Sequence, residues 1–256
     1  MITSNANTQI KNIMSLIKKP GERRRRGLFV IEGIRMFREI PKDRLDKVYV
    51  SETFEKDNSE LLSEYSYEVV SDKLFAQMSD TKSPQGIMAS VRMLNYSFEE
   101  VISGENPLLV ILENLQDPGN LGTVIRTSEG AGVTGIILSK DSVDIYNPKV
   151  IRSTMGALFR MPFVYVESVK NVLSILEEKG INTCSACLDG AVDYCDIDYT
   201  APTAVIIGNE GNGLTLETIE SSKTRIKIGM SGRLESLNAA VSTAIITYEA
   251  RRQRQK

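Results

Sequence analysis

The sequence contains no histidine among its 256 residues. This absence excludes a Ser-His-Asp or Cys-His catalytic site and any zinc site with histidine ligands. It also removes the side chain that most often acts as a general base near neutral pH. We therefore expect no metal site, and any proton transfer has to use other groups.

Cysteine is scarce: the chain has three, Cys184, Cys187 and Cys195. An odd number argues against a disulfide framework and fits a reducing cytosol. The first two form a C-x-x-C pair, but no fourth ligand is evident. Their flanking sequence, INTCSACL, is typical of a buried strand. We therefore favour structural cysteines over a metal or redox site.

Long apolar runs are also absent. No run approaches the roughly 20 residues that span a bilayer, and the start, MITSNANTQI, has no apolar signal-peptide core. We expect a cytoplasmic protein with no membrane segment.

The net charge of −2 conceals an asymmetry. Residues 1–44 contain eleven Lys/Arg against four Asp/Glu, whereas the rest of the chain is net acidic. The basic part includes the consecutive Arg23, Arg24, Arg25 and Arg26, which we place in a loop. Such a run suits a phosphate backbone, but it could equally be a solvated loop.

Hydrophobic patterning predicts two α/β regions. Residues 8–19 carry apolar residues at helical spacing, and strands and helices then alternate through GIMASVRM, giving a domain over residues 1–95. Polar residues with Gly and Pro predict a linker over residues 96–107. Residues 108–256 alternate again, from LLVILEN to a long helix from Ser236 onward. This predicts a mostly parallel sheet, which binds ligands at the carboxyl ends of its strands.

Three segments follow predicted strands. Residues 113–132, ENLQDPGNLGTVIRTSEGAG, turn from a strand into a helix that carries Arg126. Residues 206–214, IIGNEGNGL, place glycines where a backbone can pass close to a ligand. Residues 226–250 lead through a glycine-bearing loop and Ser236 into a helix rich in small residues. Each segment alone could be an ordinary junction, with Arg126 on the surface and Ser236 as a helix cap.

Taken together and in this order, the three segments resemble the signature motifs of the SpoU/TrmH family of RNA 2′-O-ribose methyltransferases, in the SPOUT superfamily. The N-terminal half is similar to that family's ribosomal-protein-like substrate-binding domain, through ITSNANTQIK, FVIEG and SPQGIMA. The resemblance implies an α/β fold in which a mostly parallel sheet carries a trefoil knot. It also implies S-adenosylmethionine as cofactor, RNA as substrate, with ribosomal RNA favoured, and a homodimer.

The resemblance also assigns residues. The positions that match the family's active site are Asn120, Arg126, Glu210, Ser236 and Asn238. Those that match its cofactor site are Gly208, Ile228 and Leu237, with Met230 and Leu188 as neighbours. The chain departs from the family at Gly229, where many members have proline, and glycine loosens that loop.

These assignments suggest roles. Because a guanidinium hardly loses its proton, we expect Arg126 to stabilise the developing alkoxide. Glu210 would orient Arg126 or accept the proton, and the arginine run would dock the RNA. Three alternatives stay open: methylation of tRNA or of an RNA base, a non-catalytic RNA-binding assembly factor, and an unrelated Rossmann-type enzyme. The last is disfavoured because neither G-x-G-x-x-G nor a P-loop is present.

Overall fold

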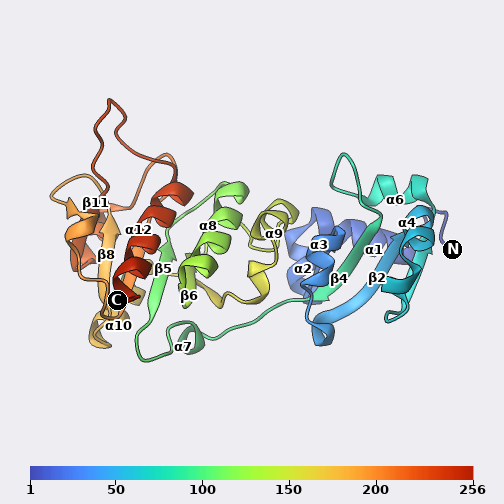
Figure 1. The fold of residues 1–256 in the computed structure, drawn as a ribbon, viewed down its shortest axis with the longest axis horizontal. Coiled ribbons are helices and arrows are strands. Elements are labelled where there is room, and N and C mark those ends of the chain that lie inside the picture. The colour runs from blue at the N-terminus through green and yellow to red at the C-terminus, as the bar shows by residue number, and fades with distance from the viewer. Residues whose placement is uncertain (256) are drawn as a thin grey trace. The chain divides into compact units, whose positions relative to one another are not determined.

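The computed structural model describes residues 1–255, which form two compact units (Figure 1). The N-terminal unit comprises Met1–Leu94 together with Asp144–Phe159, and the C-terminal unit comprises Asn95–Val143 with the residues from Arg160 onward. The first break, after Leu94, lies beside the domain boundary predicted at residue 95. The segment Asp144–Phe159 belongs to the N-terminal unit, although the sequence pattern predicts that it lies in the domain over residues 108–256.

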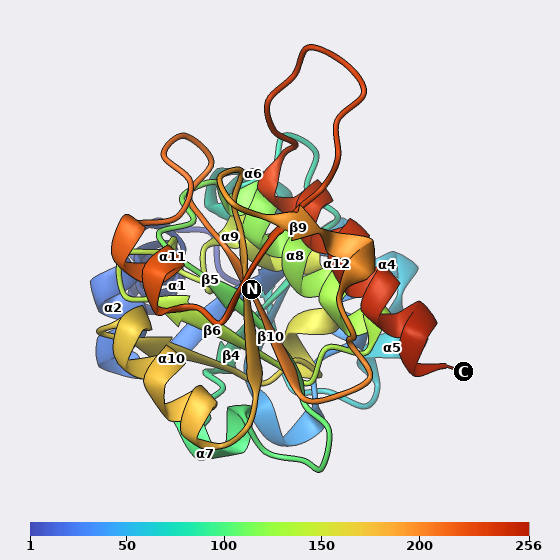
Figure 2. The same ribbon diagram turned by 90° about the vertical axis from the view of Figure 1, so that its left-hand side faces the viewer.

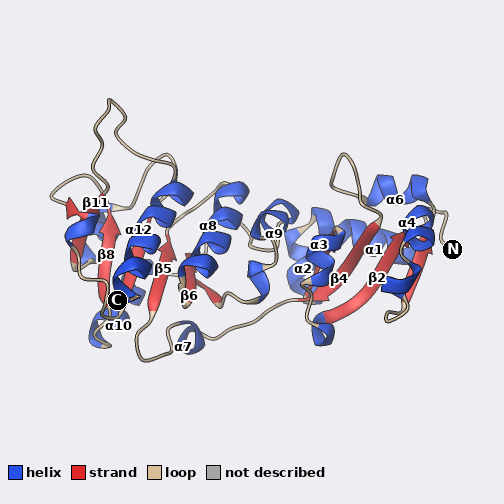
Figure 3. Ribbon diagram, in the orientation of Figure 1, coloured by secondary structure: helices blue, strands red, loops and turns tan. Residues whose placement is uncertain are grey.

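The N-terminal unit is built on a four-stranded mixed sheet in the order β1-β4-β2-β3. Its strands are β1 (Leu28–Glu32), β2 (Leu45–Ser51), β3 (Tyr67–Val70) and β4 (Ile87–Arg92). β2 and β3 are parallel, whereas β4 is antiparallel to both of its neighbours. Short helices connect them: α3 (Ile34–Arg38), α4 (Glu52–Asp57), α5 (Ser59–Leu62) and α6 (Asp72–Met78). The predicted α/β character of this region is confirmed (Figure 3).

Helix α1 (Thr8–Lys18) confirms the predicted amphipathic helix. The Asn7 side chain caps its first turn by accepting from the backbone of Gln9. Its apolar face, with Ile10 and Ile13 fully buried, packs into the main cluster of this unit.

The arginine run does not form the predicted loop. It belongs to helix α2 (Pro20–Arg26), in which Pro20 occupies the first turn and Gly27 ends the helix in the left-handed conformation at φ 64°. Proline at the start and glycine just past the end are the usual helix boundaries. Both signals are present in the sequence, and the prediction of a loop overlooked them.

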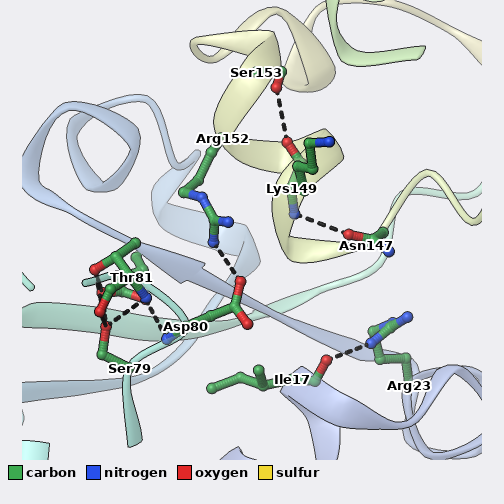
Figure 4. A network of polar contacts seen from close by, with 10 residues as sticks. Ile17, Arg23, Ser79, Asp80, Thr81, Asn147, Lys149, Arg152 and Ser153 are labelled. Carbon is green, nitrogen blue, oxygen red and sulfur yellow. Dashed lines mark hydrogen bonds and ion pairs between the residues drawn. The ribbon is translucent and has the colours of Figure 1, made fainter. Parts of the chain in front are cut away.

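The segment Asp144–Phe159 completes the core of the N-terminal unit. It contains α9 (Pro148–Thr154), and its Tyr146 ring lies 4.6 Å from that of Phe29, centroid to centroid. Two ion pairs hold it, Arg23 to Asp144 at 2.5 Å and Arg152 to Asp80 at 2.9 Å. Figure 4 shows the Arg152 side chain reaching from α9 to Asp80.

The C-terminal unit contains a seven-stranded sheet in the order β7-β6-β5-β10-β8-β11-β9. The strands are β5 (Leu108–Leu112), β6 (Gly135–Ser139), β7 (Phe163–Val166), β8 (Asn182–Ala186), β9 (Val192–Asp193), β10 (Thr203–Ile207) and β11 (Thr224–Lys227). All of their pairings are parallel, which confirms the predicted parallel sheet. β5, β6 and β10 are fully buried, as strands covered on both faces must be.

Helices cover both faces of this sheet (Figure 2). α8 (Pro118–Ala131) and α12 (Ala239–Arg254) pack together on one face, and α7 (Phe98–Val101), α10 (Val169–Glu178) and α11 (Leu216–Ser221) lie on the other. The predicted linker therefore contains helix α7, which a capping box between Ser97 and Glu100 begins. α12 starts at Ala239 with Asn238 as its cap, slightly later than predicted.

Within residues 1–255, no helix is both long and apolar enough to cross a membrane.

Candidate active site

The three motifs converge because they follow neighbouring parallel strands. β5, β10, β8 and β11 are adjacent in the sheet. The loops that follow these four strands therefore lie at the same edge of the sheet. These loops hold residues 113–117, 208–214, 187–191 and 228–237.

The carboxylate of Glu210 joins the second motif to the first. One of its oxygens, Oε1, accepts from the Asp117 amide at 2.9 Å and from Asn120 Nδ2 at 3.0 Å. The other, Oε2, accepts from the Gln116 amide at 3.1 Å. Burial alone would raise the pKa of Glu210, but these hydrogen bonds outweigh it and hold that pKa below its ordinary value of 4.5. Glu210 is therefore ionised at neutral pH.

Asn120 extends the connection to the third motif. Its Oδ1 accepts from Asn238 Nδ2 at 2.9 Å, while Asn238 Oδ1 accepts from the amides of Ala240 and Val241 and so caps α12. Glu210, Asn120 and Asn238 thus form one hydrogen-bonded chain across the three motifs, although up to 118 positions separate them.

Gly208 is required by close backbone contact inside its own loop. Two backbone hydrogen bonds between Asn209 and Gly213 close the loop. A Cβ atom at position 208 would lie 2.2 Å from the Gly213 carbonyl carbon, which no side chain tolerates. The tight turn therefore needs glycine for its own shape.

The remaining cofactor candidates surround the same edge. Leu188 follows β8 with 55% of its surface exposed, and Ile228, Met230 and Leu237 are half-buried around the loop after β11. Among residues 1–255, the backbone groups of Ile228, Met230 and Leu237 make no hydrogen bond. Free backbone donors and acceptors beside apolar side chains fit a purine ring, so the residues present suit the adenosine part of S-adenosylmethionine.

Arg126 and Ser236 stand outside the hydrogen-bonded chain. Arg126 is exposed on α8, and Ser236 is exposed in the loop before α12. The side chain of neither residue makes a hydrogen bond or ion pair with any of residues 1–255. We predicted that Glu210 orients Arg126, but the structure shows no hydrogen bond or ion pair between the two side chains. The Glu210 oxygens instead accept hydrogen bonds from Asn120 and two backbone amides.

The four arginines of α2 have different environments. Arg23 is only 2% exposed, and it donates to the Leu16 and Ile17 carbonyls as well as to Asp144. Arg25 and Arg26 pair with Glu22, and the hydrogen bond from Arg25 is the main cause that lowers the pKa of Glu22 to about 2. The Arg24 side chain is exposed and has no hydrogen-bond or ion-pair partner among the described residues.

The cysteines show no sign of a metal site. Cys184 is buried in β8, which raises the pKa of its thiol to about 12, whereas Cys195 is exposed. The described part of the chain contains no group of three His, Cys, Asp or Glu side chains that could hold a metal ion.

Sequence reasoning missed three residues that shape this edge: Glu113, Asn114 and Asn209. Glu113 is 6% exposed and accepts from Thr215 and Thr218, while Asn209 donates from Nδ2 to the Asn114 carbonyl at 2.8 Å. A charged residue followed by asparagine, directly after the apolar run LLVIL, is the signal that could have identified Glu113 and Asn114.

A parallel α/β sheet with loops bonded together at its carboxyl edge is the arrangement in which open α/β domains bind their ligands. The chain belongs to the SpoU rRNA Methylase family, which it matches over residues 107–248. Residues 7–89 match the MRM3-like substrate binding domain. Both matches confirm the resemblance drawn from the motifs.

Individual relatives extend over the full chain. It is 31% identical to the 23S rRNA (guanosine(2553)-2′-O)-methyltransferase RlmP of Bacillus subtilis, covering 98% of each protein. The solved structure of an AdoMet-bound rRNA methyltransferase from Sinorhizobium meliloti superimposes with a TM-score of 0.86 at 28% identity, covering 98% of this chain and 97% of that one. The SpoU methyltransferase AviRb of Streptomyces viridochromogenes, solved with AdoMet, gives 0.85 at 28% identity, covering 97% and 99%.

Proposed function

We propose that this protein transfers a methyl group from S-adenosylmethionine to the 2′-hydroxyl of a ribose in ribosomal RNA. The observation that carries the proposal is the hydrogen-bonded chain Glu210–Asn120–Asn238, which joins the three motifs of the SpoU family at one edge of the sheet. Relatives named as 23S rRNA 2′-O-methyltransferases, two of which match over 97% or more of the chain, support the substrate class and the ribose oxygen as acceptor.

The cofactor would be held by backbone groups after β10 and β11. Bound S-adenosylmethionine supplies a methyl group activated by the adjacent positive sulfur. Gly208, Ile228 and Leu237 would hold it through main-chain atoms, with Met230 and Leu188 as neighbouring side chains. Such positioning lowers the free-energy barrier to methyl transfer by several kcal/mol, because it aligns the methyl group with the acceptor oxygen.

The acceptor side would rest on Arg126. Its free guanidinium can stabilise negative charge as the 2′-oxygen loses its proton, and it can also contact the adjacent phosphate. Glu210 is a poor proton acceptor, because its pKa is lowered and both of its oxygens already accept hydrogen bonds. We therefore assign Glu210 to positioning Asn120, with Asn238 and Ser236 lining the acceptor site.

The N-terminal unit would dock the RNA. Its match to a substrate binding domain and the exposed Arg24 and Arg25 of α2 support this role. Arg24, Arg25 and Arg26 would contact phosphates, which position an RNA without reading its sequence. The target ribose has to be accessible, so an unpaired nucleotide is the expected substrate.

Two further features belong to the proposal. The path of the chain from β11 back to α12, which packs against α8 and β10, is compatible with the trefoil knot implied by the family.

A homodimer is supported by the side chains of Val241 and Tyr248, each 46% exposed one heptad apart on α12. The small residues Ala239, Ala240 and Thr243 are buried within the unit, so they do not offer the contact surface. The partner subunit could complete the site around Arg126.

Methyl transfer from radiolabelled S-adenosylmethionine to ribosomal RNA lacking this modification tests the function. Mass spectrometry of the digested product should find one nucleotide methylated on the ribose. A methylated base, or transfer to tRNA alone, would favour the alternatives within the superfamily. Absence of S-adenosylmethionine binding in a calorimetric titration would contradict the proposal and favour a non-catalytic assembly factor.

A further inference from the structure

We propose that Asn114 is a positioning residue that holds the cofactor loop, residues 208–214, in its binding conformation, with Glu113 anchoring the far end of that loop. The inference rests on the proposed function, because the loop contains the cofactor candidate Gly208 and the bridging Glu210. Neither Asn114 nor Glu113 would touch the cofactor.

The backbone of Asn114 has an unusual conformation. Asn114 and Met155 are the two non-glycine residues with positive φ among residues 1–255, at 55° and 51°. Asparagine enters this left-handed region more readily than other residues with a side chain. The conformation occurs where the chain leaves β5, so it sets the direction of the first motif.

Hydrogen bonds to Ser139 and Asn209 hold Asn114 in place. Its amide donates to Ser139 Oγ at 2.8 Å, and its Oδ1 accepts from the same hydroxyl at 2.9 Å. Ser139 is the last residue of the neighbouring strand β6. These bonds leave the Asn114 carbonyl directed at Asn209 Nδ2, which donates to it at 2.8 Å.

Asn209 transmits this anchor into the loop. Its Oδ1 accepts from the amides of Gly211 and Asn212, at 2.9 and 3.0 Å, so one side chain ties the loop to itself and to Asn114. The loop is therefore held at its entrance by Asn114 and in its middle by the contacts of Glu210.

Glu113 holds the exit. Its carboxylate accepts from the Thr215 amide at 2.8 Å and from the hydroxyls of Thr215 and Thr218 at 3.0 and 2.5 Å. Thr215 also caps helix α11, so Glu113 fixes the point at which the loop becomes helix. Two consecutive residues directly after β5 thus define both ends of the cofactor loop.

Substitution at position 114 separates this role from simple stability. In Asn114→Val a β-branched residue resists the left-handed conformation, so S-adenosylmethionine binding should weaken about tenfold, the effect of about 1.4 kcal/mol. Asn114→Gly keeps the conformation and the carbonyl, and should bind within about twofold of wild type. Met155→Val places the same strain in the N-terminal unit and is the matched control: its melting temperature should fall while cofactor affinity is unchanged.

Calorimetric titration with S-adenosylmethionine, together with melting curves, provides the readout. Asn209→Ala, which removes the side chain that reaches Asn114, should weaken binding similarly and serves if Asn114→Val does not fold. Wild-type affinity in either folded variant would overturn the inference and leave the proposed function intact. If wild type itself does not bind S-adenosylmethionine, the proposed function fails instead.

Discussion

The guanidinium of Arg23 and the carboxylate of Asp144, which are 121 positions apart in the sequence, meet at 2.5 Å inside the N-terminal unit. Arg23 belongs to a run that resembles a phosphate-binding patch, yet its side chain is among the most deeply buried charged groups of the described chain. Its remaining donors satisfy two carbonyls at the end of α1. Arg23 therefore stabilises the fold and is not accessible to RNA.

Replacing Arg23 with alanine should destabilise the protein strongly. Removing one partner of a buried ion pair leaves an uncompensated charge and unpaired carbonyls, and costs about 3 kcal/mol. Urea denaturation followed by circular dichroism measures the change in the free energy of unfolding. Arg24→Ala, one residue away but exposed, is the control and should change stability by less than about 0.5 kcal/mol. Equal midpoints for the two variants would contradict the structural role of Arg23.

The exposed Arg24 and Arg25 of α2, together with the half-buried Arg26, should determine the salt dependence of RNA binding. Combined replacement of Arg24, Arg25 and Arg26 by alanine should lower the slope of log affinity against log salt by roughly 0.7–0.9 for each phosphate that the variant no longer binds. Cofactor binding should not change. RNA titrations over a salt series measure the slope. Arg252→Ala on α12 removes an arginine that pairs with Glu249 much as Arg25 pairs with Glu22, and provides the comparison. Unchanged slopes would mean that α2 is solvated and contacts no RNA.

Arg126→Ala should abolish methyl transfer with cofactor affinity nearly unchanged. The side chain is exposed and unpaired within the described chain, so its removal disturbs no internal contact. Loss of one charge-stabilising donor typically lowers turnover by about 100-fold or more. Single-turnover assays and calorimetry measure the two quantities separately. A parallel loss of cofactor binding would show that Arg126 belongs to the cofactor side.

The pH dependence should reveal the anchoring role of Glu210. Its pKa is lowered in the folded protein, so its contribution to stability is present above its ordinary pKa of 4.5 and is lost as pH falls through the lower native value. The free-energy difference between wild type and Glu210→Gln should therefore be constant from pH 7 to about 5.5 and shrink in more acidic solution. Denaturation at a series of pH values tests this. A difference that grows on acidification would reverse the assigned shift.

The proposed dimer predicts that Tyr248→Asp and Val241→Asp dissociate the protein. Both side chains are half-exposed on one stripe of α12, and a carboxylate there would be buried unpaired in an interface. Sedimentation at micromolar concentration should show dimer for wild type and monomer for each variant. Lys170→Ala on α10, on the other face of the sheet, should remain dimeric. A monomeric wild type with full activity would refute the dimer.

Most strands could be predicted from the sequence, because short apolar runs such as LLVILEN and TAVIIG are typical of buried strands. It located the family motifs but not the bonds between them, since nothing in the spacing of Asn120 and Asn238 indicates that their amides meet. It placed the arginine run in a loop although Pro20 and Gly27 bound a helix. The burial of Arg23 could not be predicted, because its partner Asp144 follows a strand of the other unit.

The discontinuous N-terminal unit has a consequence for synthesis. Leu94 ends the first part of that unit. The core of the unit remains incomplete until the ribosome has synthesised the chain to Phe159, because Tyr146 and Asp144, the partner of Arg23, belong to the second part. At translation rates of about 5–20 residues per second, this interval lasts roughly 3 to 13 seconds. During that time β5 and β6 are synthesised while the preceding unit is still unfinished. The nascent chain therefore contains unpaired apolar strands of both units at the same time. A chaperone that binds apolar segments would protect the chain most during this interval.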